Sequence, residues 1–330
     1  MTTDDTRLAA LKATKLAVLV SALSGVAPDD LVVPDRSSTI VGCLADDRAW
    51  VLADRVGDLG PALHWFRRQA VAGLTILSEP HVAADLARRA AGLHADIEVK
   101  RVTGSEASTA EPAPPPSPPE LADEIWRAAA VMADAGIAVV DDHGRLTGEV
   151  NGLEVARVEP PSPTDPLSEV TLSVGVGQAD RQLHGYVHGH LDQLESLRRA
   201  VATVSEIRRA GAGLHPLTRL ARPRWLRSVL VAEPIRAGLS GLQPQPPLRP
   251  NPGVFDTEPA AAYSAAERVT VVCSAGVDLD LIPEAVDYRL RIDPGSRLLL
   301  VLPPQDVKLA TRGVIDLVPE AQVLALEPPW

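Results

Sequence analysis

Short apolar runs alternate with amphipathic segments over the first hundred residues. Runs such as LTIL at residues 74–77 are typical of buried strands, and the segments between them carry apolar residues at helical spacing. Strands separated by helices of about ten residues predict a parallel sheet built from βαβ units. We place strands at residues 39–44, 50–53, 74–77 and 97–102, and helices at residues 60–69 and 80–93.

An amphipathic segment precedes this sheet. Residues 12–27 have the order of basic, apolar and small residues found in signal peptides, but acidic Asp4 and Asp5 come before them. Leucines in and just before this segment recur at helical spacing, so we expect an N-terminal helix that packs on the sheet. These leucines are Leu8, Leu11, Leu16, Leu19 and Leu23.

The composition changes after this first unit, which we assign to residues 1–103. Residues 104–119 are rich in Ser, Ala, Glu and Pro, with six prolines between Pro112 and Pro119. Such a segment buries too little apolar surface to offset its chain entropy. We therefore expect an extended, mobile linker.

A middle α+β domain is predicted for residues 120–213. A helix at 120–135 is followed by a hairpin, whose strands at 137–140 and 146–150 flank the turn Asp-Asp-His-Gly. Further strands are expected at 153–158 and 170–176, and a long helix at 191–209. The order is helix, hairpin, strand, strand, helix.

The last part of the chain repeats the pattern of the first. After a loop-rich connection at residues 214–262, with a short helix at 224–231, the unit at 263–330 again alternates strands with helices. The alternation fits a duplicated half-Rossmann unit, two halves of one sheet, or two unrelated βαβαβ stretches. Strands are expected at 269–273, 298–302 and 322–326, and helices at 282–290 and 305–317. The predicted class is α/β, with Rossmann-like units at both ends of the middle domain.

The middle domain resembles the core of the PD-(D/E)XK, restriction-endonuclease-like nucleases. The resemblance rests on the element order and on GEVNGLEVARVE followed by VTLSVGVG and a helix, and it covers less than a third of the chain. In that family, carboxylates on adjacent strands bind Mg²⁺ and a lysine offsets developing charge. The resemblance implies Glu149 or Glu154 as the first carboxylate and Glu124 as a helix glutamate.

The family's acid-x-lysine triplet is missing. Its place is taken by Ser173, Val174 and Gly175, the nearest later acid is Asp180, and no lysine occurs between Lys100 and Lys308. We therefore lean against an enzyme. A divergent nuclease using Glu149, Glu154 and Asp180 with Mg²⁺ or Mn²⁺ remains an alternative, and otherwise no cofactor is expected.

A group of histidines follows the last predicted strand of the middle domain. Asp180, His184 and His188 have the spacing i, i+4, i+8, which places them on one face of a helix and suits zinc. Gly185 and Gly189 weaken such a helix. We favour a solvated entry into the following helix over a metal site.

Arginines are concentrated between Arg198 and Arg227. Eight arginines and one acid give this segment a formal charge of +7, within a chain whose net charge is -11. Guanidinium groups bind carboxylate or phosphate, so the segment either docks on the protein's own acidic groups or binds an unknown protein or phosphate-bearing partner. The candidate contact residues are Arg208, Arg209, Arg219, Arg222, Arg224, Trp225 and Arg227.

Composition limits the classes of function. The net negative charge and an aromatic content of 3% argue against a sequence-wide nucleic-acid clamp, although local nucleic-acid contact is possible. No apolar run approaches the roughly 20 residues of a membrane span. Cys43 and Cys273 lie in separate apolar runs, so we expect buried thiols, which fit a cytoplasmic location.

Three functions are compatible with these features. The leading one is a non-catalytic binding or scaffold protein that makes contact through the arginine-rich segment. The second is the divergent nuclease. The third is a nucleotide-sensing module using the carboxyl ends of the Rossmann-like strands, near Asp54 and residues 274–278, where open α/β sheets bind ligands. Glycine-rich phosphate loops and a nucleophile-elbow motif are absent from the sequence.

Overall fold

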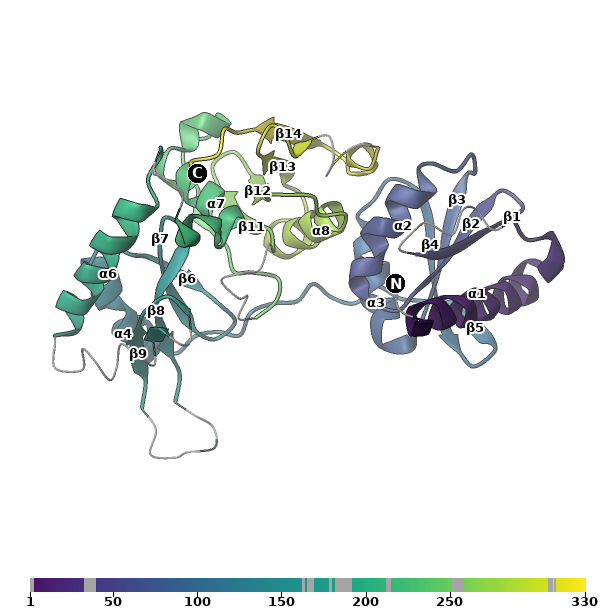
Figure 1. Cartoon of the computed structure of the whole chain (residues 1–330), viewed down its shortest axis with the longest axis horizontal. Helices are drawn as coiled ribbons and strands as arrows, with labels where there is room; N and C mark the ends of the chain where they lie inside the picture. Colours follow the sequence, from purple (N-terminus) through teal and green to yellow (C-terminus); the bar gives the residue numbers. More distant parts are fainter. Residues whose placement is uncertain are drawn as a thin grey trace. The chain divides into compact units, whose positions relative to one another are not determined.

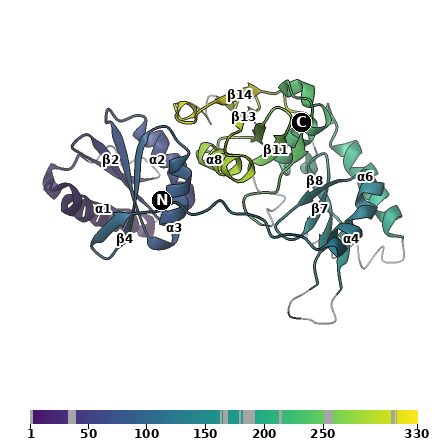
Figure 2. The ribbon, with the colours of Figure 1, turned by 180° about the vertical axis from the view of Figure 1, so that it is seen from behind.

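The computed structural model describes residues 3–32, 40–161, 164, 169–177, 180–181, 192–211, 215–250, 258–307, 311 and 313–330. The chain forms two compact units, and Figures 1 and 2 show its ribbon from opposite sides. Unit 1 consists of Met1–Pro115, Asp278–Leu290 and Lys308–Ala321. Unit 2 consists of Pro116–Val277, Arg291–Val307 and Gln322–Trp330.

Unit 1 contains a mixed five-stranded sheet with the order β1-β2-β3-β4-β5. The three central strands are parallel, as the alternation of strands and helices predicted, while both edge strands are antiparallel to their neighbours. The strands are β1 (Val41–Ala45), β2 (Arg48–Ala53), β3 (Gly73–Ser78), β4 (Asp96–Thr103) and β5 (Glu106–Thr109).

Helices cover both faces of this sheet. The N-terminal helix α1 (Thr3–Ser24) buries Leu16 and Leu19 against a face that includes Trp50 and Leu52, so the predicted packing helix is confirmed. The connecting helices α2 (Leu59–Phe66) and α3 (Pro80–Ala91) lie on the other side of the sheet (Figures 1 and 2).

The segment expected as a mobile linker is partly a strand. Glu106–Thr109 pairs with β4 as β5, before the first of the six prolines. Beyond it, the Ala113 amide donates to the Ala84 carbonyl at 2.9 Å, and Arg88 donates to the Pro114 carbonyl at 3.3 Å. An edge strand needs partners on one side only, so a short polar segment suffices to form it.

The C-terminal segments of unit 1 are held by buried charges. Asp278–Leu290 contains most of α8 (Leu281–Ile292), whose Asp287 accepts hydrogen bonds from Arg88 at 2.8 Å and from Arg89 at 2.6 Å. Asp280 accepts from Arg89 at 2.5 Å and from the Gly60 amide at 3.0 Å.

Unit 2 contains an antiparallel four-stranded sheet in the order β6-β7-β8-β9, which includes the predicted hairpin and the two further predicted strands. Helices α4 (Asp123–Asp134) and α6 (Gln193–Ile207) share its apolar core, which includes Met132, Leu146 and Leu197. The strands are β6 (Ala138–Asp141), β7 (Leu146–Val150), β8 (Leu153–Glu159) and β9 (Thr171–Val174).

A second five-stranded sheet has the order β10-β11-β12-β13-β14. Helix α7 (Arg222–Ala232) packs Leu226 and Leu230 on this sheet. Strands β12 and β13 are parallel, and β11 is antiparallel to β12. The strands are β10 (Gln243–Pro244), β11 (Ala260–Ser264), β12 (Val269–Cys273), β13 (Arg297–Leu302) and β14 (Ala321–Ala325).

Two expectations for the C-terminal region change. The sheet includes Ala260–Ser264, so it begins inside the stretch expected as loop-rich connection. The helix expected at residues 305–317 falls partly outside the described residues, and its end is a 3₁₀ turn, η5 (Ile315–Leu317). Other 3₁₀ turns are η1 (Pro28–Asp30), η2 (Val56–Asp58), η3 (Pro216–Arg219) and η4 (Pro234–Ala237).

Both cysteines are buried free thiols, as predicted. Burial raises the pKa of the Cys43 thiol to about 11 and that of Cys273 to about 12. Among the described helices, none combines the length and apolar character required to cross a bilayer.

Replacing Gly152 with alanine tests the packing of α7 on the middle sheet. Gly152 has φ +72° in the turn between β7 and β8, and a Cβ there would lie 2.2 Å from the Arg224 carbonyl carbon. We expect Gly152→Ala to lower the free energy of unfolding by more than about 2 kcal/mol. Gly136→Ala is the control, since Gly136 has φ +79° with open space around it, and should cost about 1 kcal/mol in urea unfolding. Equal costs would contradict the proposed close approach.

Asp280 predicts a component of the pH dependence of stability. Burial raises its pKa from 3.8 to about 6, although Arg89 favours the carboxylate. Between these values the folded chain retains a proton that the unfolded chain has lost, so this contribution falls by up to roughly 3 kcal/mol as pH rises from 4 to 6. Subtracting the urea-unfolding profile of Asp280→Asn from that of the wild type should isolate this slope. A flat difference would contradict it.

Candidate functional site

The three carboxylates of the nuclease hypothesis do not form one site. Glu149 on β7 and Glu154 on β8 are partners in the strand register, but their carboxylates bind different groups. Asp180 is exposed and accepts a hydrogen bond from the Val176 amide at 2.6 Å. Each carboxylate therefore has its own local role.

Glu149 is a buried anion balanced by arginines of α7. Arg227 donates to Glu149 Oε2 at 2.5 Å, and Arg224 lies 3.8 Å from Oε1. Burial raises the pKa of Glu149, but the charges of Arg227 and Arg224 lower it more strongly, so the pKa lies below its ordinary value. Glu149 is thus a charged link between β7 and α7.

Glu154 is neutralised in a similar way by arginines of its own region. Arg157 binds both carboxylate oxygens, at 2.9 and 2.8 Å, and Arg181 binds Oε1 at 2.6 Å. The Glu154 and Arg157 side chains are only 2% and 5% exposed. This geometry is a bidentate, charge-assisted pair with a second cation added.

The remaining candidate ligands give no metal site in the described residues. Within residues 40–161, 169–177, 180–181 and the other described ranges, no group of three or more His, Cys, Asp or Glu side chains is arranged to hold a metal ion. Glu124 is exposed in the first turn of α4. His184 and His188 lie outside the described residues. Asp192 caps α6 by accepting from the Leu194 amide at 3.2 Å.

Four of the seven candidate contact residues in the arginine-rich segment are internal. Arg208 is fully buried, stacks on Trp225 at 4.2 Å and donates to the carbonyls of Leu217 and Leu220 at 2.8 and 2.7 Å. Burial, together with the nearby charge of Arg224, lowers the pKa of Arg208 to about 9. Arg208, Arg224, Trp225 and Arg227 therefore support the domain from within rather than forming an exposed contact surface.

The outer arginines are arranged differently. Arg209 and Arg219 are exposed, and neither forms an ion pair with a described residue. Because Arg208 binds the carbonyls on both sides of Arg219, it holds the η3 segment next to the end of α6. Arg222 is half-buried and lies over the Trp330 ring at 5.0 Å.

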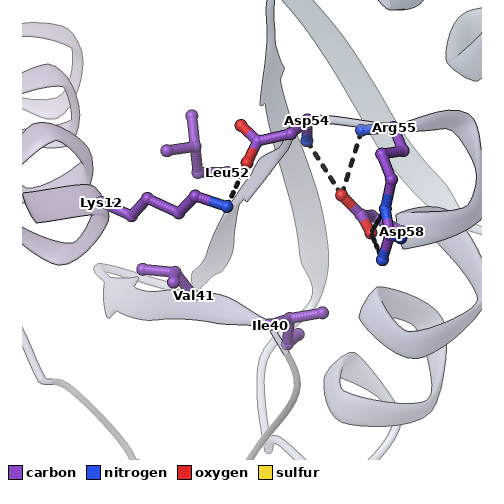
Figure 3. A pocket seen from close by; sticks show the side chains of 7 residues that line it. All are labelled: Lys12, Ile40, Val41, Leu52, Asp54, Arg55 and Asp58. Atoms are coloured by element: carbon purple, nitrogen blue, oxygen red, sulfur yellow. Dashed lines mark hydrogen bonds and ion pairs between the residues drawn. The ribbon is translucent and has the colours of Figure 1, made fainter. Parts of the chain in front are cut away.

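A pocket lies at the carboxyl end of β2, the region near Asp54 for which the sequence predicted a ligand site. It has a volume of about 190 Å³. Asp54 directly follows β2 and pairs with Lys12 of α1, while Asp58 faces Arg55 on the other side of the pocket (Figure 3). The lining residues are Lys12, Ile40, Val41, Leu52, Asp54, Arg55 and Asp58.

The two ion pairs of this pocket differ in rigidity. Asp58 accepts from the backbone amides of Asp54 and Arg55 at 2.9 and 3.1 Å and from the Arg55 guanidinium, so it is fixed by four donors. The side chains of Lys12 and Asp54 are 34% and 38% exposed and keep contact with solvent.

The second predicted ligand region, residues 274–278, shows fewer features of a binding site. Ser274 is buried, and its hydroxyl has no hydrogen-bond partner among the described residues. Asp278 accepts a hydrogen bond from the Asp280 amide at 2.9 Å.

Sequence reasoning missed several residues of these sites. Lys12 lies one helical turn before buried Leu16, and a cation on the packing face of a helix was the available signal. Arg157 and Arg181 had no comparable signal, because their partner Glu154 is recognised only once the strands are paired.

A search of protein-family models, curated proteins and solved structures found no match to this chain.

Removing one partner of the Glu149–Arg227 pair should destabilise unit 2. Arg227→Met leaves a buried carboxylate with Arg224 at 3.8 Å as its nearest cation, and we expect a loss of about 3 kcal/mol in urea unfolding. Glu149→Leu combined with Arg227→Met should recover most of that loss.

The matched control is the exposed pair Arg199–Glu195, whose side chains are 59% and 52% exposed. Arg199→Met should change stability by less than about 0.5 kcal/mol. Similar effects at both sites would show that Glu149 does not need its partner.

Proposed function

We propose that this protein is a non-catalytic binding protein whose middle domain keeps a nuclease-like framework between Rossmann-like units. One observation carries the proposal: both strand carboxylates at the positions of the resemblance are neutralised by guanidinium groups. Glu149 binds Arg227, and Glu154 binds Arg157 and Arg181. Arginine stays protonated under ordinary conditions, so these guanidinium groups do not act as proton donors in place of the missing lysine.

The arginines also compete with a divalent cation for the same oxygens. A metal site would need carboxylates that converge on one point with free lone pairs. Here both oxygens of Glu154 accept from guanidinium donors, and Asp180 is engaged with the backbone. Metal binding would require breaking buried ion pairs, which is unfavourable.

The contact surface that we propose consists of Arg209 and Arg219. Both are exposed on segments that buried Arg208 holds together, so the two charges are presented with little loss of backbone freedom. Exposed guanidinium groups favour an anionic partner, either phosphate-bearing or acidic.

A second role, small-molecule sensing, is favoured by the pocket at Asp54. The pocket lies at the carboxyl end of a parallel strand, which is where open α/β sheets bind ligands. At about 190 Å³ it is smaller than the roughly 300–1,000 Å³ typical of drug-sized ligands, and glycine-rich phosphate loops are absent from the sequence. A nucleotide is therefore a poor fit.

Retention on phosphocellulose tests the contact surface. The chain has a net charge of -11, so retention at low salt needs a local basic patch. We expect the wild type to bind and Arg209→Glu with Arg219→Glu to flow through. Arg297→Glu, which reverses an exposed arginine at the start of β13, should elute at the same salt concentration as the wild type.

Two results would overturn the proposal. One is equal loss of retention in the double variant and in Arg297→Glu, which would indicate general charge rather than a surface. The other is cleavage of DNA or RNA with Mg²⁺ or Mn²⁺ that Glu154→Ala abolishes, which would make the protein a nuclease.

A further inference from the structure

The pocket at the end of β2 has balanced charges. It is lined by two cations and two anions, grouped as the pairs Lys12–Asp54 and Arg55–Asp58 on opposite sides (Figure 3). Its formal charge is therefore zero. A ligand with a net charge, such as a phosphate or a polyamine, would meet a repelling group beside every attracting one. A ligand with separated and opposite charges meets favourable partners for both.

Apolar side chains occupy the remaining wall. Ile40, Val41 and Leu52 come from the β1 region and β2, whose hairpin pairing places Val41 opposite Leu52. Contact with these side chains favours a ligand with a short aliphatic group, because each CH₂ that they bury is removed from water. The volume of about 190 Å³ limits that group to a few carbons.

The Lys12–Asp54 pair can open to admit a ligand, whereas the Arg55–Asp58 pair holds the wall of the pocket. Lys12 and Asp54 are about one-third exposed, and an ion pair of this kind contributes little to stability, so it opens at low cost. Asp58 is held by two backbone amides and Arg55, and it fixes the backbone that carries Asp54. A ligand can therefore insert between Lys12 and Asp54 while the opposite wall stays in place.

We infer that this pocket binds a small zwitterionic α-amino acid with a short aliphatic side chain. The ligand carboxylate accepts from the Lys12 ammonium, and the ligand ammonium donates to the Asp54 carboxylate. The side chain packs on Val41 and Leu52. This inference rests on the proposed sensing role of the pocket and is independent of the arginine surface.

Calorimetric titration of the full chain tests the ligand class. The panel contains L-valine, which carries both charges, isobutyrate, which carries only the negative charge, and isobutylamine, which carries only the positive charge. AMP represents nucleotides. We expect L-valine to bind at least tenfold more tightly than isobutyrate or isobutylamine, because each analogue leaves one of Lys12 and Asp54 without its partner.

Variants locate the binding. Lys12→Met and Asp54→Asn should each weaken L-valine binding at least tenfold. Lys15→Met is the matched control, since Lys15 lies on the same helix and pairs with Glu79 at 2.8 Å with similar exposure. It should leave affinity within twofold of the wild type. Thermal melting of each variant verifies that it is folded.

The possible outcomes distinguish failure of the zwitterion inference from failure of the proposed sensing role. Binding of isobutyrate, isobutylamine or AMP as tight as that of L-valine, and sensitive to Lys12→Met, would overturn the zwitterion inference but retain a sensing pocket. No binding by any member of the panel would overturn both. Equal weakening by Lys12→Met and Lys15→Met would place the ligand elsewhere and overturn the inference.

Discussion

A buried carboxylate has to be paired, and in unit 2 this requirement joins two layers of structure. Glu149 extends from β7, and Arg227 meets it from α7, a helix whose Leu226 and Leu230 pack on the C-terminal sheet of the unit. Separating the two would leave both charges in a medium of low dielectric, which costs several kcal/mol. The pair therefore ties α7 to the middle sheet, and Gly152 also approaches α7 closely at Arg224.

The same kind of pairing recurs on the neighbouring strand of the middle domain. Glu149 and Glu154 occupy adjacent strands, and the charge of each carboxylate is balanced by arginines. A guanidinium satisfies carboxylate oxygens through directed hydrogen bonds and has no site at which to activate water. Between the end of α6 and α7, the arginines that remain exposed are Arg209 and Arg219.

Most helices and strands could be predicted from local sequence patterns. The partners of the charged side chains could not, because many of them are distant in the sequence. The apolar runs at β3 and β12 and the Asp-Asp-His-Gly turn between β6 and β7 are readable because their signals are local. Strand β5 was missed because the prolines that follow it dominate the composition of that segment. The partner of Glu149 is 78 residues away, so no spacing rule identifies it. For the same reason, sequence could not separate internal Arg208 from exposed Arg209.

The two α/β sheets show how one local arrangement is adapted to different tasks. In each, an antiparallel hairpin leads into parallel strands, β1-β2-β3 in one and β11-β12-β13 in the other. An aspartate precedes the helix that follows each hairpin. Asp58 binds the amides beside its own strand end and shapes a pocket, whereas Asp280 binds Gly60 and Arg89 and secures a distant segment. A carboxylate accepts several hydrogen bonds, so the donors within reach of the aspartate before the helix determine its role. It lines a pocket at Asp58 and links two chain segments at Asp280.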